Sequence, residues 1–186
     1  MADEKTGLED VSEMREITIR LDTYDDIFSD FDPRPFSQRE LSEDFLKEVQ
    51  RRYLEDKRGR YEVHFTIPSS ERDMDEEALI KRRLREHFSF MKKQAEAEIH
   101  GMRQRGYIYI VLGALVLLAD AFAVVMLQES NLVYKILSIM LVPAGWYGMW
   151  TGIEKVIDEP ASAAERRLAC EKFEKAAYIF MSDELE

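Results

Sequence analysis

The chain has 186 residues, a net charge of −11 and 46% hydrophobic residues, figures that by themselves describe an ordinary acidic soluble protein. Its one cysteine, Cys170, excludes an intrachain disulfide framework and fits a reducing cytosol. Residues 1–15 are acidic and polar, which predicts a mobile tail. They contain no basic stretch followed by an apolar run, so we expect no cleaved signal peptide.

Two segments alternate apolar and polar residues with the period of a half-buried strand. The first is Glu16–Asp22, and the second is Tyr61–Pro68, where Pro68 ends the pattern because it cannot donate to a sheet. Between them, Ser37 and Glu40 have capping-box spacing and open a predicted helix that ends near Gly59. Its apolar stripe contains Leu41, Phe45, Val49 and Tyr53.

This order predicts a β-α-β head over residues 16–70 with two parallel strands. Two strands are too few for a stable sheet, because parallel sheets seldom leave their edges bare. Another chain, the C-terminal segment or a partner would have to complete it. We favour other copies of the same chain, because the C-terminal segment has the pattern of a helix.

An acidic loop joins the first strand to the helix. Its candidate site residues are Asp25, Asp26, Phe28, Asp30, Phe31 and Asp32. Carboxylates can bind a divalent cation, but the spacing of these acidic residues does not match that of the EF-hand ligands. We therefore expect no metal site. Asp side chains also stabilise turns, and the phenylalanines can pin the loop to the head. The loop is therefore structural or binds a partner.

Residues 71–106 form a predicted helical stalk. Between Glu71 and Arg105 there is no proline, and the apolar positions from Ile80 to Met102 repeat with a period close to a straight helix. Gly106 is the only plausible joint before the next segment. The basic cluster Lys81–His87 suggests anionic lipid or nucleic acid. Because acidic residues accompany it, we interpret it as a solvated helix face and expect no nucleic-acid partner.

Two apolar stretches, Tyr107–Leu127 and Leu132–Ile153, are each long enough to cross a membrane as a helix, which takes about 20 residues. They predict a transmembrane hairpin over residues 107–153. The alternative is a buried hairpin of a soluble protein, but neither stretch has the polar face of a surface helix. Basic residues flank the hairpin and are absent from its connection, which predicts that both termini are cytoplasmic and that the protein lies in the cytoplasmic membrane. The aromatic residues expected at the inner interface are Tyr107, Tyr109, Trp146 and Trp150.

Asp120 is the one carboxylate within the first apolar stretch, and an ionisable residue in a membrane segment is a functional candidate. The matching depth in the second stretch is near Ser138, and Lys135 lies one turn nearer the outside, with a side chain long enough to reach inward. An Asp120–Lys135 or Asp120–Ser138 contact would make the carboxylate structural. Alternatively, Asp120 moves protons or cations, or is protonated and bonded to a lipid or a partner helix.

The second apolar stretch contains a glycine face formed by Gly145, Gly148 and Gly152, which lets another helix approach closely. Pro143 lies just before it and should bend the helix. The glycines mark a contact with another subunit or partner, or they pack on the chain's own first span. Beyond the hairpin, residues 154–186 predict a cytosolic helix that starts at Pro160.

No nucleophile with a base, no phosphate-binding glycine loop and no cluster of metal ligands stands out along the chain, although folding can assemble a site from distant residues. The pattern therefore predicts an α+β membrane protein with no cofactor and no enzymatic activity. Its expected role is that of a homo-oligomeric scaffold or docking platform, with the lipid bilayer and a cytosolic or membrane protein as partners. The alternative is a small oligomeric ion channel or proton-coupled element that uses Asp120.

Overall fold

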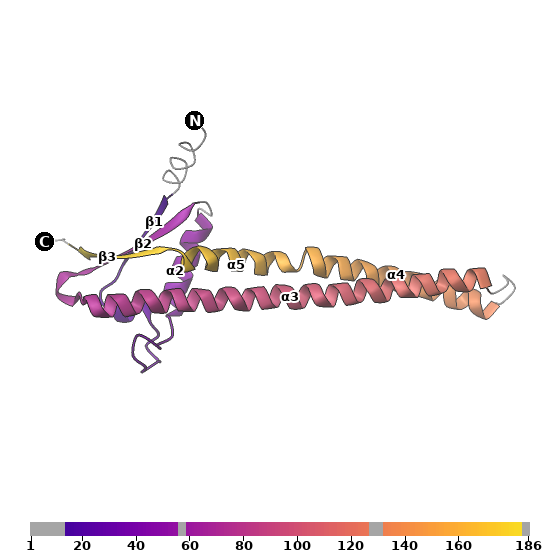
Figure 1. Ribbon diagram of the computed structural model, residues 1–186, viewed down its shortest axis with the longest axis horizontal. Coiled ribbons are helices and arrows are strands. Elements are labelled where there is room, and N and C mark those ends of the chain that lie inside the picture. The colour runs from indigo at the N-terminus through magenta and orange to yellow at the C-terminus, as the bar shows by residue number, and fades with distance from the viewer. Residues whose placement is uncertain (1–13, 56–58, 127–131, 184–186) are drawn as a thin grey trace, which may run out of the picture. The chain divides into compact units, whose positions relative to one another are not determined.

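The computed structural model describes residues 14–55, 59–126 and 132–183 and combines a small sheet with long helices (Figure 1). Its elements in chain order are β1 (Met14–Arg20), the short 3-10 helix η1 (Tyr24–Ile27), α2 (Glu43–Glu55), β2 (Arg60–Pro68), η2 (Ser69–Glu71), α3 (Met74–Met126), α4 (Leu132–Ile157), α5 (Pro160–Glu174) and β3 (Ala177–Asp183). Most of the predicted tail and the connection between the apolar stretches lie outside the described residues.

The chain divides into two compact units. The head comprises Met1–Lys92 and Leu168–Glu186, and the hairpin unit comprises Lys93–Arg167. Helix α3 contributes to both units, because it runs from Met74 to Met126 as one helix. The predicted stalk and the predicted first span are therefore parts of the same element, and the helix continues through Gly106, where we expected a joint.

The sheet of the head has three parallel strands in the order β1-β2-β3. The parallel pairing of β1 and β2, with Ile17 opposite Val63, confirms the predicted β-α-β arrangement. The third strand corrects the prediction that other copies complete the sheet. It is the C-terminal segment of the same chain, which pairs along β2 with Tyr178 opposite Val63 and lies beside it in Figure 1. Residues 160–183 thus form helix α5 followed by strand β3, in place of the single helix predicted for residues 154–186.

The core of the head lies on one face of this sheet. The central strand contributes Val63, Phe65 and Ile67, which are almost completely buried, and β3 adds Tyr178 and Phe180. Three helices supply the covering side chains, which include Phe45, Val49 and Tyr53 of α2, Ile80, Leu84 and Phe88 of α3, and Phe173 of α5. Ring contacts such as Phe65 with Phe180, at 4.9 Å between centroids, join the layers.

Helix α2 confirms the predicted stripe of Phe45, Val49 and Tyr53 but begins at Glu43, later than the proposed capping box of Ser37 and Glu40. Leu41 is buried outside the helix, in an isolated antiparallel bridge to Phe28. The preceding residues are held by the loop instead, because the Glu40 carbonyl accepts a hydrogen bond from the Ser29 amide. A pairing between distant loop residues thus replaces the first predicted turn of helix.

Candidate functional site

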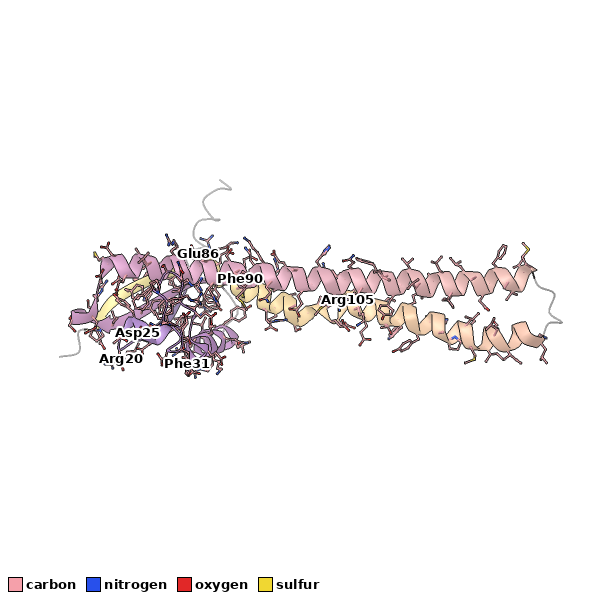
Figure 2. All side chains as sticks on the ribbon, turned by 90° about the horizontal axis from the view of Figure 1, so that it is seen from below. Arg20, Asp25, Phe31, Glu86, Phe90 and Arg105 are labelled. Carbon is pink, nitrogen blue, oxygen red and sulfur yellow. The ribbon has the colours of Figure 1, made fainter. Side chains whose placement is uncertain are left out.

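The hairpin unit is built on glycine contacts between α3 and α4, which run side by side in both views (Figures 1 and 2). A Cβ atom added at Gly113 would lie 2.7 Å from the carbonyl oxygen of Gly145, and one at Gly152 would lie 2.7 Å from the carbonyl oxygen of Gly106. Gly148 also faces α3, at 3.5 Å from the Cα atom of Gly113. The structure therefore places all three predicted packing glycines against the chain's own first apolar stretch.

Large apolar side chains of the hairpin unit point outward. Exposed examples along the two helices are Leu115, Leu118, Phe122, Ile136, Ile139 and Met140. Trp150 is 67% exposed, and Tyr107, Tyr109 and Trp146 are exposed as well. Both helices are long and apolar enough to cross a membrane. Small residues inside and large apolar residues outside are typical of helices packed in lipid, where the surroundings are as apolar as a leucine side chain.

Asp120 belongs to the buried side of α3. It follows Gly106 and Gly113 at heptad spacing, and these three are the buried residues of the helix between Gly106 and Met126. The side chain of Asp120 is 7% exposed and interacts with another group of the chain. The carboxylate therefore lies on the same face of α3 as the glycines that contact α4. It does not lie on the outer, apolar surface of the helix.

The glycine contacts set the antiparallel register of the two helices. Gly106 meets Gly152 and Gly113 meets Gly145, so one more heptad brings Asp120 level with Ser138. Ser138 is half-buried, whereas Lys135 is exposed. Of the two residues expected near Asp120, the register thus favours Ser138 as its neighbour and leaves Lys135 at the surface.

Most of the acidic loop is held within the head. Asp32 is buried and accepts hydrogen bonds from the Arg34 side chain at 2.7 and 2.8 Å and from the Glu40 amide at 2.8 Å. The Arg34 guanidinium lowers the pKa of the Asp32 carboxyl. Asp26 accepts hydrogen bonds from the amides of Asp22 and Thr23, and Asp25 pairs with Arg39. These carboxylates have structural roles in the loop.

The two phenylalanines of the loop behave oppositely. Phe28 is buried and stacks on Phe36 with ring centroids 5.0 Å apart. Phe31 is 97% exposed, next to exposed Asp30, and Figure 2 shows it at the surface of the head. The Asp32 amide donates to the Ser29 carbonyl and closes a turn around it. An anchored turn therefore holds a bare aromatic ring in solvent.

Part of the basic cluster of α3 makes contacts inside the head, whereas Arg82 and Arg85 stay exposed. Arg83 donates to the carbonyl oxygen of Arg39 at 2.9 Å, and the ammonium of Lys81 lies 5.2 Å from the ring centre of Phe180. Burial, together with the nearby charge of Arg83, lowers the pKa of His87. These contacts hold the loop and the sheet on α3, a role that the one-dimensional pattern did not indicate.

One polar arrangement was missed in the sequence. On the sheet face opposite the core, His64 lies between two carboxylates, with Nδ1 2.8 Å from Glu16 and Nε2 3.3 Å from Glu62. The Nδ1 contact has the distance of an ion pair without the geometry of a hydrogen bond. Parallel pairing of the two predicted strands would have revealed it. Within the described part of the chain, no three His, Cys, Asp or Glu side chains gather closely enough to hold a metal ion.

Comparison with known proteins adds no relative. No family model matches the chain, and no match is found among the curated proteins or the solved structures.

Proposed function

We propose that the chain is a non-enzymatic membrane protein that holds its head at the inner face of the cytoplasmic membrane as a docking platform for a protein partner. The observation that carries the proposal is the inverted packing of the hairpin unit. Gly106, Gly113, Gly145 and Gly152 lie between α3 and α4 while the large apolar side chains face outward. In water this arrangement would expose a large apolar surface, and in lipid it costs nothing.

The docking role is supported by Phe31. Aromatic residues are enriched at the centres of protein interfaces, and a ring on an anchored turn loses little conformational freedom on binding. Asp25, Asp26 and Asp32 hold the turn through their own contacts, so the loop does not have to refold around a partner.

Membrane anchoring is tested by alkaline extraction of membranes from cells that express the full chain. The anchored protein stays in the membrane pellet, whereas a peripheral protein is released to the supernatant. Reporter fusions at each end then test the topology, and signal from the cytoplasmic side at both termini is expected. Release by alkali, or a terminus outside the cell, would contradict the proposal.

Docking is tested by placing a photo-crosslinking amino acid at Phe31 in cells. The matched control is Leu54 of α2, another exposed apolar residue of the head. Discrete protein adducts are expected at position 31 and not at position 54. Equal labelling at both positions, or none at Phe31, would remove the evidence for this surface.

A second candidate, a channel or proton-coupled element, is favoured by the burial of a carboxylate between two apolar helices. Asp120→Asn tests it, because the amide keeps the shape of the side chain and removes its charge. The docking account predicts that liposomes with the wild-type chain conduct protons no faster than empty liposomes, and that the variant does not differ. A wild-type proton flux that Asp120→Asn abolishes would favour the channel.

A further inference from the structure

Within the hairpin unit, α3 has a second row of uncharged residues on the side away from its buried glycines. The row follows the a and d positions of a heptad pattern and is called the outer row here. Its members are Gln94, Ala97, Gly101, Gln104, Ile108, Val111, Leu115, Leu118 and Phe122. Apart from Gly101, which is half-buried, all of them are exposed. In the inner row, Gly106 and Gly113 are already covered by α4, and Asp120 is buried.

The part of the outer row before Tyr107 distinguishes a protein contact from a lipid contact. Beyond Tyr107 the helix is apolar on every exposed side, as any lipid-facing helix would be. Between Lys93 and Arg105 the helix is rich in charge, and every charged residue lies outside the row. These charged residues are Lys93, Glu96, Glu98, Arg103 and Arg105. A face that only contacts water has no reason to exclude charge in this way.

Gly101 is a second observation on the same face. A Cβ atom added there meets no atom within 4 Å, so no contact within the hairpin unit requires a glycine. In the interior of a helix, glycine is less favourable than alanine by about 1 kcal/mol. A shallow hollow also follows this side of the helix; three residues of the row, Gln104, Ile108 and Val111, line it together with His100, Arg103, Tyr107 and Leu112. A glycine in the row and a hollow beside it leave room for a second helix to approach closely.

We propose that the outer row of α3 packs against the outer row of a second copy of the same chain, in a parallel pair. The inference rests on the proposed membrane anchoring, since two copies inserted in the same direction are parallel. The row continues without a break from the charged part of α3 into its apolar part. A partner that covers the whole row must therefore pass from water into lipid at the same level as α3 does. A second copy of α3 does so at every position of the row.

The chemistry of the row suits a copy of itself. In a parallel two-fold pair each residue of the row faces its own equivalent, so a charged residue would meet a like charge, and the row has none. Gln94 and Gln104 can pair with their equivalents because an amide both donates and accepts hydrogen bonds. Lys93 falls at the flanking position that approaches Glu98 of the second copy, where its positive charge would add to the ion pair that Glu98 forms with Arg166 at 2.8 Å.

Cysteine crosslinking in native membranes tests the contact. In a Cys170→Ala background, Ala97→Cys is placed in the row and Ala161→Cys, at an exposed position of α5, is the control. A disulfide requires Cα atoms within about 7 Å, a separation that facing a and d positions can meet. With copper phenanthroline as oxidant, Ala97→Cys should form a species of twice the chain mass, and Ala161→Cys should stay monomeric.

Three results would overturn the proposal: no dimer for Ala97→Cys, equal dimer for Ala161→Cys, or an adduct of another mass, which would mean a different partner. Alkaline extraction of the same membranes separates the two claims. A chain that is retained in the membrane but forms no dimer would contradict the contact between two copies and leave the membrane anchoring supported. A chain that is released by alkali would contradict the anchoring, and with it the parallel pair.

A second variant avoids any doubt about folding. Gly101→Arg introduces a charge at a position where an added Cβ atom has no neighbour within 4 Å among the described residues beyond its own helix turn, so the hairpin unit should tolerate it. Ala161→Arg, at an exposed position of α5, is the matched control. The protein mass in detergent should fall twofold for Gly101→Arg and stay dimeric for Ala161→Arg. An unchanged mass for Gly101→Arg would contradict the proposed interface.

Discussion

The head and the hairpin unit bury opposite kinds of residue. The head encloses Phe65, Ile67 and Leu84, whereas the hairpin unit encloses Gly113, Gly152 and Asp120 and exposes Leu118 and Trp150. In water, burial of large apolar side chains stabilises a core, by about 25 cal/mol for each Å² removed from solvent. In lipid that gain disappears, and close contact between backbones holds helices together. The two units of one chain thus bury different kinds of side chain. The hydrophobic fraction of the whole chain averages over this difference and does not show it.

Each unit contains its own spectroscopic or chemical reporter. Cys170, the single cysteine, packs at the edge of the head core, and its labelling by maleimide reports opening of the head. Trp146 and Trp150 are the two tryptophans, both on α4, and their fluorescence reports the hairpin unit. Both signals can be followed on the full chain.

The largest effect is expected for Phe65→Ala, which empties the centre of the head. Phe65 is completely buried, and truncation of such a phenylalanine costs about 3–5 kcal/mol. Cys170 should become reactive at a much lower urea concentration, while tryptophan fluorescence in detergent stays unchanged. Phe31→Ala is the matched control, because its ring is in solvent and its loss should not move the labelling midpoint. A similar urea midpoint of Cys170 labelling for both variants would contradict the placement of Phe65 at the centre of the core.

Gly113→Ala should destabilise the hairpin unit by about 1–3 kcal/mol, because the new methyl group meets the backbone of α4. The transition in sodium dodecyl sulfate, followed by tryptophan fluorescence, should shift to a lower detergent fraction. Gly148→Ala is the matched control, because a Cβ atom added there lies 3.5 Å from its nearest neighbour, an ordinary van der Waals contact, and should not lower the transition. If both glycines respond alike, close backbone contact does not hold the hairpin.

The smallest effect concerns pH and an ion pair of the head. The Lys92 ammonium lies against Glu174 at 2.5 Å and lowers the pKa of that carboxyl below its ordinary 4.5. A lowered folded-state pKa contributes stability that is present above the unfolded pKa and lost as the pH falls through the folded one. For a partly exposed pair this contribution is below about 1 kcal/mol.

The variant Glu174→Gln isolates that contribution. The urea midpoint of Cys170 labelling should be lower in the variant than in the wild type at pH 7, and the difference should shrink as the pH falls below 4.5. A difference that grows on acidification would show that the ion pair does not stabilise the head.

The sequence predicted the local elements well where one period dominates. β1, β2 and the buried stripe of α2 follow from alternation and helical spacing. β3 was missed because Tyr178, Ile179, Phe180 and Met181 are all apolar, so neither period stands out, and its partner β2 is distant in the chain. The start of α2 was misplaced because a bridge between Phe28 and Leu41 depends on tertiary contact.

The candidate site was predictable as a list of residues and not as an arrangement. Asp120 and the three glycines of α4 stand out by composition, but their common row with Gly106 and Gly113 appears only when two helices are placed side by side. The loop shows the same limit. Phe28 and Phe31 have the same side chain and lie three residues apart, yet one is in the core and the other is in solvent.

The central claim is that the outer surface of the hairpin unit faces lipid. Spin labels in a Cys170→Ala background test it directly in liposomes, with one label at Ile139, an exposed residue of α4 that is not part of the outer row, and another at Phe31. The account predicts that oxygen reaches the label at Ile139 and that a water-soluble nickel complex does not, with the reverse preference at Phe31. Equal access of the nickel complex to both labels would contradict it.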